Sequence, residues 1–219
     1  MSQPRRSFFR QLLAAAATLA LALPAFAQSD FVTLKPAQPT DNAAKIEVLE
    51  FFSYGCPHCG ELAKPLHDWA AKLPAEVQLR RVPITFGRAA WANVARLYYA
   101  LEATGDLEKL DLKVFRAIHE QRVNLFEEKA IFEWVAGQGI DAKKFADAYN
   151  GFSIQSKVKR GDQILAAYGN SLPREVGERF GVPAVFVDGK FLVTARAPAE
   201  MLVAVDKAIA KARAERGKK

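Results

Sequence analysis

Apolar and polar positions along the chain follow two different periods, and each period predicts a type of element. Residues 46–52 (IEVLEFF) are rich in β-branched and aromatic residues and contain no breaker, so they predict a buried strand that ends before Ser53. From Leu62 to Leu73 the apolar residues recur at helical spacing, and Pro74 is expected to stop this helix. A helix therefore follows directly on the first strand.

The next apolar run, residues 77–86 (VQLRRVPITF), predicts a second strand. A strand, a helix and a strand in this order favour parallel neighbours that are joined by a right-handed crossover. Pro57 suits the first position of the helix, whereas Pro65 lies inside the helix and predicts a kink about one turn upstream. Together these residues predict a βαβ unit.

Residues 88–172 have helical periodicity throughout. Five amphipathic stripes lie in this stretch, and we interpret their apolar positions as core packing and not as contacts to a cofactor. The inner faces of five helices are therefore expected to form a core of their own.

Strands return after this stretch. Residues 184–187 (AVFV) and residues 190–194 predict two strands, and the turn Asp188-Gly189 is expected to join them into a β-hairpin with a two-residue loop. Residues 198–216 predict a closing helix.

The order of these elements predicts an α/β fold that is interrupted by helices. Residues 28–87 and 173–219 are expected to form one domain, and residues 88–172 an all-helical domain inserted into it. No Gly/Ser-rich linker and no internal repeat divides the chain. Half of the residues are hydrophobic, which is enough for a core without a stabilising disulfide.

The first 27 residues have the pattern of an export signal. Arg5, Arg6 and Arg10 give a positive start, residues 12–23 are apolar but too short to span a bilayer, and residues 25–27 (AFA) have the small-x-small form of a cleavage site. We expect cleavage after this site and export to the periplasm, with an uncleaved anchor as the alternative. The stretch RRSFF also resembles a twin-arginine signal, so the Sec and twin-arginine routes both stay open.

The net charge of +7 is modest, and much of it lies in the signal and in the C-terminal tail KARAERGKK. No aromatic residues are interleaved with the basic residues of this tail, so we interpret it as a solvated helix end and expect no nucleic-acid partner.

The only two cysteines, Cys56 and Cys59, lie in the motif CPHC, which allows three interpretations. A structural disulfide that closes a loop of four residues would contribute only about 2 kcal/mol to stability. A structural zinc site needs four ligands, and the remaining candidates, His58, His67 and His119, show no ligand-pair spacing. We therefore expect no metal, and the redox interpretation explains the arrangement more fully.

A redox pair at the start of a helix has a clear physical basis. The helix N-terminus favours the thiolate of Cys56, which is the nucleophile in disulfide exchange. Cys59 lies one turn further in and is placed to resolve a mixed disulfide on Cys56. Pro57 holds the turn, and His58 is expected to add positive charge or a donor beside the sulfur. Because a stabilised thiolate favours the reduced form, the disulfide becomes a stronger oxidant.

Two stretches carry a resemblance to a known family. EFFSYGCPHC, at residues 50–59, resembles the active-site stretch of the DsbA family of thiol:disulfide oxidoreductases, and GVPAVFVDGKF, at residues 181–191, resembles the cis-proline loop of that family. The resemblance covers the chain after the signal and implies a thioredoxin fold with an inserted helical domain. It also implies that Cys56 is the exposed nucleophile, that Cys59 is the resolving cysteine and that Val182-Pro183 lies beside the disulfide. Val182 could then offer its backbone to an extended substrate peptide.

Glu50 is a further candidate. Strand alternation places it on the same face as Ile46, Val48 and Phe52, where burial would raise its pKa and fit it to exchange protons with Cys59. The family has an acidic residue with such a proposed role at this position. The alternative is a strand-end glutamate that reaches solvent.

The resemblance implies a monomeric periplasmic oxidase that donates its disulfide to unfolded exported proteins with free thiols. It implies a DsbB-like, quinone-linked membrane protein for reoxidation and no cofactor besides the Cys56–Cys59 disulfide. An isomerase or reductase of the same fold, and a non-catalytic peptide- or metal-binding module, are the alternatives. Gly55 and Gly60 depart from the family, whose best-known members have larger residues there, so partner preference is left open.

Overall fold

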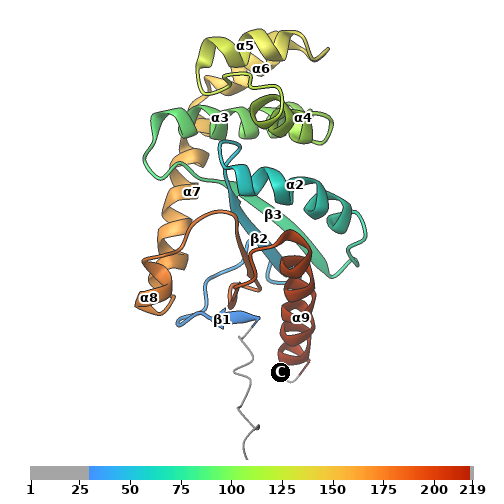
Figure 1. The fold of residues 1–219 in the computed structure, drawn as a ribbon, viewed down its shortest axis with the longest axis vertical. Helices are drawn as coiled ribbons and strands as arrows, with labels where there is room; N and C mark the ends of the chain where they lie inside the picture. Colours follow the sequence, from blue (N-terminus) through green and yellow to red (C-terminus); the bar gives the residue numbers. More distant parts are fainter. Residues whose placement is uncertain (1–29, 218–219) are drawn as a thin grey trace, which may run out of the picture.

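The computed structural model describes residues 30–217, and a five-stranded mixed sheet lies at the centre of one half of the molecule (Figure 1). The strand order is β1-β5-β4-β2-β3. The pair β2–β3 is parallel, as the βαβ pattern predicts, and the other pairs are antiparallel. The strands are β1 (Phe31–Thr33), β2 (Ile46–Phe52), β3 (Val77–Pro83), β4 (Ala184–Val187) and β5 (Phe191–Val193).

Helices cover both faces of this sheet. Apolar residues of α2 and α9 pack on the face that carries Ile46 and Val48, whereas α7 packs on the opposite face against Leu49 and Phe51. The helices are α2 (Pro57–Ala70), α3 (Ala89–Thr104), α4 (Leu107–His119), α5 (Glu128–Ala136), α6 (Ala142–Tyr149), α7 (Phe152–Asn170), α8 (Arg174–Gly177) and α9 (Pro198–Arg216).

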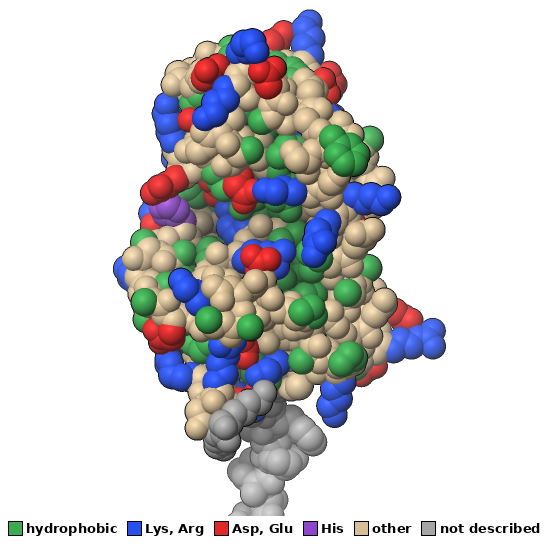
Figure 2. Space-filling model, turned by 180° about the vertical axis from the view of Figure 1, so that it is seen from behind, with side chains coloured by type: hydrophobic (Ala, Val, Ile, Leu, Met, Phe, Trp, Pro, Cys, Tyr) green, Lys and Arg blue, Asp and Glu red, His purple; other side chains and the backbone are tan. Residues whose placement is uncertain are grey.

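The helices α3 to α7 lie between β3 and β4 in the sequence and form the other half of the molecule, with α7 running back along the sheet (Figure 1). Their apolar faces form one core, and this core includes Phe52, Tyr54 and Cys59 from the sheet half. The helical part therefore packs directly against the end of β2 and the start of α2. Seen from behind, hydrophobic side chains are visible where the two halves meet, with Lys and Arg side chains around them (Figure 2).

The predicted hairpin is present, but its loop has three residues and not two. Val187 pairs with Phe191, so Asp188, Gly189 and Lys190 all lie between the strands. Asp188 and Gly189 have positive φ values of 55° and 63°. The predicted turn at these two residues is present, because the Lys190 amide donates to the oxygen of Val187 at 3.0 Å, and Lys190 is the additional residue before the strand pairing begins.

Element ends differ from the prediction by a few residues. The helix after β2 ends at Ala70, four residues before Pro74, and β3 ends at Pro83 and not at residue 86. The short strand β1 was missed because three residues show no period. The helix α2 runs through Pro65 without interruption, and a kink there stays a prediction.

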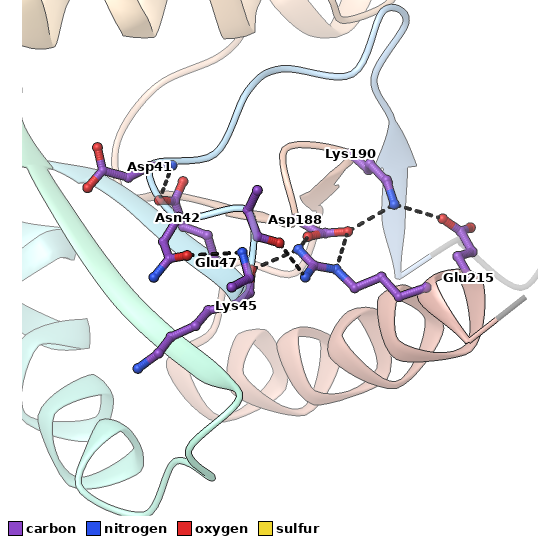
Figure 3. A network of polar contacts seen from close by, with 10 residues as sticks. Asp41, Asn42, Lys45, Glu47, Asp188, Lys190 and Glu215 are labelled. Carbon is purple, nitrogen blue, oxygen red and sulfur yellow. Dashed lines mark hydrogen bonds and ion pairs between the residues drawn. The ribbon is translucent and has the colours of Figure 1, made fainter. Parts of the chain in front are cut away.

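A polar network lies at the start of β2, the end of this strand that is far from Cys56 (Figure 3). Arg216 of α9 donates to the buried Asp188 and to the backbone oxygens of Ala43 and Lys45, at 2.9 and 2.7 Å. Lys190 contacts the other oxygen of Asp188 at 2.9 Å. Burial opposes the charge of Asp188, but these hydrogen bonds lower its pKa. The network therefore ties α9 to the hairpin loop.

Among residues 30–217, no helix combines the length and the apolar character that a membrane crossing needs. The predicted signal at residues 1–27 lies outside the described residues.

Candidate active site

The position of Cys56 follows from the strand before it. All seven residues of β2 are buried, which fixes the chain as it leaves the sheet. Cys56 is the N-cap of α2 with φ −94° and ψ 119°, and its amide donates to the oxygen of Ser53 at 3.0 Å. Pro57 occupies the first helical turn, where its fixed φ suits the helix and its missing N–H costs nothing.

The surroundings of Cys56 favour its thiolate. The two cysteines are not bonded to each other, so the site is in its dithiol form. A hydrogen bond from the Cys59 thiol lowers the pKa of Cys56 most, burial opposes it, and the backbone amides of Cys59 and His58 lower it further, to about 6. The two backbone amides belong to the first helical turn, whose N–H groups have no partner within the helix. Cys56 is therefore largely ionised at neutral pH.

Cys59 is in the opposite situation. Its side chain is fully buried, and burial, followed by the hydrogen bond to Cys56 and the charge of Glu50, raises its pKa far above the usual range. Two cysteines one helical turn apart thus differ strongly in acidity. One is fit to attack or leave as an anion, and the other needs a proton whenever its bond to sulfur breaks.

His58 is exposed, and it contributes to the site through its backbone amide and through its charge. Its Nδ1 lies 3.1 Å from Oε2 of Glu61, and this hydrogen bond, with the charge of Glu61, raises the pKa of the imidazole. The charge of His58 in turn lowers the pKa of Cys56, after the backbone hydrogen bonds. The imidazole ring is hydrogen-bonded to Glu61, whereas the backbone amide of His58 forms a hydrogen bond with the sulfur of Cys56.

The Val182–Pro183 loop lies beside Cys56, as the resemblance implies. The peptide bond between these residues is cis, and Sγ of Cys56 lies 3.3 Å from the oxygen of Val182, to which the thiol donates when it is protonated. Val182 and Pro183 are half-buried, so the loop stays accessible from outside. Cys56 is only 7% exposed, so the exposed position that the resemblance implies for it is wrong, but its sulfur lies against a partly exposed loop, which suits the binding of an extended peptide.

Glu50 is fully buried, which excludes the alternative of a strand-end glutamate that reaches solvent. In the β2–β3 register it pairs with Arg81, whose Nε donates to Oε2 of Glu50 at 2.6 Å. Burial raises the pKa of Glu50, and Arg81 only partly opposes this effect. Arg81 also donates from Nη1 to Asp111 Oδ2 at 2.6 Å, and the Tyr54 hydroxyl donates to Asp111 Oδ1 at 2.6 Å.

The two glycines that depart from the family pattern lie against side chains of the helical part. A β-carbon at Gly55 would lie 2.7 Å from Cε1 of Phe126 and 3.0 Å from Nε1 of Trp91. The space beside Cys56 that a larger residue would take is thus filled by aromatic rings from another part of the chain.

At Gly60, a β-carbon would lie 3.1 Å from Cδ2 of His119. The imidazole of His119 also lies 2.7 Å, through Nε2, from the oxygen of Tyr54, which fixes the active-site loop. A groove of about 580 Å³ runs here between α2 and α4, and Pro57, Gly60, Arg116 and His119 are among its lining residues.

Sequence reasoning missed Arg81, Asp111, Tyr54 and His119 as parts of the site. The sequence does point to Arg81 in one respect, because it is a charged residue inside a predicted strand. If helices cover that face of the sheet, such a residue needs an oppositely charged partner. No such signal exists for Asp111 or His119, which look like ordinary polar positions on an amphipathic helix. Within residues 30–217, no cluster of three or more His, Cys, Asp or Glu side chains could hold a metal ion.

A thioredoxin fold with an acidic thiol at a helix start, a buried second thiol and a cis-proline loop defines a thiol:disulfide oxidoreductase. The family model for the DSBA-like thioredoxin domain matches residues 47–206. The thiol:disulfide interchange protein DsbA of Bordetella parapertussis is 41% identical over 193 residues, which cover 85% of this chain and 86% of the relative. The corresponding protein of Pseudomonas aeruginosa is 33% identical over 191 residues, 86% of each chain.

The solved structures give the same result. The crystal structure of Pseudomonas aeruginosa DsbA superposes with a TM-score of 0.77 at 33% identity, covering 87% of this chain and 95% of that chain. The chain therefore belongs to the DsbA family, and the thioredoxin fold with a helical insertion is confirmed. It is a thiol:disulfide oxidoreductase that acts on substrate proteins.

Proposed function

We propose that this protein donates its Cys56–Cys59 disulfide to newly exported proteins in the periplasm. The single observation that carries this direction is the position of Cys56 at the N-cap of α2, where the Cys59 thiol and the backbone N–H groups of the first turn lower its pKa to about 6. Stabilising the Cys56 thiolate stabilises the dithiol form, and a stable dithiol form makes the disulfide a strong oxidant. The predicted export signal supports the compartment.

The reaction follows from the two thiols. A substrate thiolate attacks Sγ of Cys56, the bond between Cys56 and Cys59 breaks, and Cys59 leaves with the electron pair. Because Cys59 is buried, its sulfur takes up a proton, and the buried Glu50 would provide it. A second substrate thiolate then attacks the first substrate sulfur and releases Cys56 as a thiolate. The substrate loses two electrons, and the enzyme gains them.

The loop at Val182 and Pro183 would hold the substrate during this exchange. The oxygen of Val182 already lies 3.3 Å from the Cys56 sulfur. An extended substrate segment that pairs with this backbone would bring its own cysteine to Cys56. Pro57 contributes the fixed turn that presents the sulfur, and His58 contributes charge.

Turnover requires reoxidation of the dithiol. A DsbB-like, quinone-linked membrane protein would accept the two electrons, and the protein would act as a monomer with no cofactor besides its disulfide. The membership in the DsbA family supports this assignment.

The reduction potential of the Cys56–Cys59 pair tests the direction of the reaction. Equilibration of the purified protein with glutathione redox buffers should give a potential well above that of thioredoxin, which is about −270 mV. The Cys56→Ser variant is the blank for the assay. A potential close to that of thioredoxin would show that the protein works as a reductase, and the oxidase proposal would then be wrong.

A further inference from the structure

A buried chain of ionisable groups links the helical part of the molecule to the active site. It begins at Tyr54 and Asp111, continues through Arg81 and ends at Glu50, with contacts of 2.6 Å at each step. Asp111 is the one member that comes from the inserted helices, on α4. The guanidinium of Arg81 also lies over the ring of Phe52, 4.1 Å from its centroid, which fixes its position between the two carboxyl groups.

The acidic groups in this cluster outnumber the basic ones. Two carboxyl groups share one guanidinium, so the cluster carries a net negative charge if both are ionised. A net charge in a buried site is costly, and the cluster becomes neutral when one carboxyl group holds a proton.

The hydrogen bonds decide which carboxyl group holds that proton. Both oxygens of Asp111 accept hydrogen bonds, one from Tyr54 and one from Arg81, so neither oxygen lacks a donor. Glu50 accepts only through Oε2, and its Oε1 has no hydrogen-bond partner within residues 30–217. The free oxygen of Glu50 is therefore the place for the proton.

The other ionisable groups around Glu50 do not compete for this proton. Burial raises the pKa of Tyr54 and of Tyr98 on α3, so both phenols stay neutral. Cys59 on α2 has a raised pKa as well, chiefly because it is buried. Proton transfer between Glu50 and Cys59 is thus the remaining exchange in this part of the site.

We propose that Asp111 is a positioning residue for the redox reaction. Its ion pair with Arg81 prevents the guanidinium from stabilising the carboxylate of Glu50 alone, so Glu50 keeps a proton for the leaving thiolate of Cys59. This inference rests on the proposed role of Glu50 as a proton donor. The inserted helices thereby take part in the chemistry. Without Asp111 the guanidinium of Arg81 would form an ion pair with Glu50 alone and favour the ionised form of Glu50. Glu50 would then have no proton to give.

The Asp111→Asn variant tests this proposal in the full-length protein. The first measurement is the pH titration of the Glu50 side-chain carboxyl carbon by NMR, assigned by its absence in Glu50→Gln. We expect the midpoint of Glu50 to fall by about one pH unit or more in D111N. Glu108→Gln removes an exposed charge from the same helix and should leave this midpoint unchanged.

The second measurement is the rate at which oxidised enzyme forms a mixed disulfide with a model thiol peptide. D111N should lose roughly tenfold or more at pH 7, about as much as E50Q, since both remove the proton donor. The double variant should be no slower than either single variant. Tyr54→Phe removes one of the two donors to Asp111 and should shift the Glu50 midpoint in the same direction by less, which provides a test if D111N does not fold.

An unchanged Glu50 midpoint in D111N, or losses that multiply in the double variant, would overturn the inference. If instead the midpoint falls in D111N while E50Q keeps the wild-type rate, Asp111 positions the proton as inferred, and the role of Glu50 under the proposed function is wrong. The two failures are therefore distinguishable.

Discussion

At the scale of single residues, the site depends on the contrast between two thiols. Cys56 is stabilised as an anion by the Cys59 thiol and by the N–H groups of the first helical turn, whereas Cys59 is destabilised as an anion by the core around it. This contrast favours the reduced form of the pair, and therefore the transfer of the disulfide to a substrate. The first prediction concerns the free energy that this contrast contributes.

The reduced protein should become more stable as the pH rises from about 6 to about 9. The pKa of Cys56 is lowered from 9.0 to about 6 on folding, so its contribution to the free energy of unfolding is fully present above the unfolded value and is lost as the pH falls through the folded value. At pH 7 this contribution is roughly 1 kcal/mol. Urea unfolding of the reduced protein across this range measures it. The reduced Cys56→Ser variant should lack the rise, and equal profiles for the two proteins would contradict the lowered pKa.

The second residue-scale prediction concerns Gly55. In Gly55→Ala the new methyl group meets Phe126 at 2.7 Å, so Phe126 must move, and we expect a loss of about 1–3 kcal/mol in the free energy of unfolding. Adding Phe126→Ala should relieve the clash, so that the double variant loses less than the sum of the single variants. Gly181→Ala, where the added carbon meets open space, is the control. Strictly additive losses would show that Gly55 and Phe126 do not constrain each other.

At the scale of elements, the two ends of β2 contact different parts of the molecule. Its C-terminal end delivers Cys56 to the start of α2, while its N-terminal end lies beside the network that ties α9 to the hairpin loop. Because β2 is buried along its whole length and pairs with both β3 and β4, the network at one end supports the strand that positions the other. The strength of that support is measurable.

Arg216→Ala should lower the free energy of unfolding by about 2 kcal/mol, because it leaves the buried Asp188 without its guanidinium partner. Arg213→Ala on the same helix breaks only an exposed contact with Glu76, at 2.7 Å, and should cost much less than Arg216→Ala. Urea unfolding of both variants gives the comparison. Equal losses would mean that the network at Asp188 contributes no more than a surface ion pair.

At the scale of the whole molecule, the two halves share one core. Phe52, Tyr54 and Cys59 pack in the same apolar cluster as Leu110 and the other inner residues of the inserted helices. A shared core of this kind couples the unfolding of its parts. The helical insertion is therefore a structural part of the active site.

Leu110→Ala should test this coupling from the helical side. Leu110 is fully buried on α4, and its truncation should cost about 2–5 kcal/mol. We expect the urea transition seen by circular dichroism and the exposure of Cys59 to a thiol reagent to shift to lower urea together. If Cys59 stays protected while the helical signal is lost, the halves unfold separately.

Much of the fold was predictable because it depends on local pattern. The run at residues 46–52, the helical spacing after Cys56 and the closing helix each repeat one period over enough residues to be recognised, and the helical stretch between residues 88 and 172 was visible as a change of period. Element ends and the three-residue hairpin loop were not predictable, since they depend on contacts such as that of Gly189 with Gln38.

The sequence by itself determined the chemistry at Cys56 and Cys59. A strand, a breaker and a proline place these cysteines on the first turn of a helix, and the acidity of the first cysteine follows from local geometry. Only the tertiary structure decided what surrounds them: Arg81 beside Glu50, Asp111 beside Arg81, and Phe126 against Gly55. Buried charges and close contacts join residues that are distant in the chain, and only packing can bring them together.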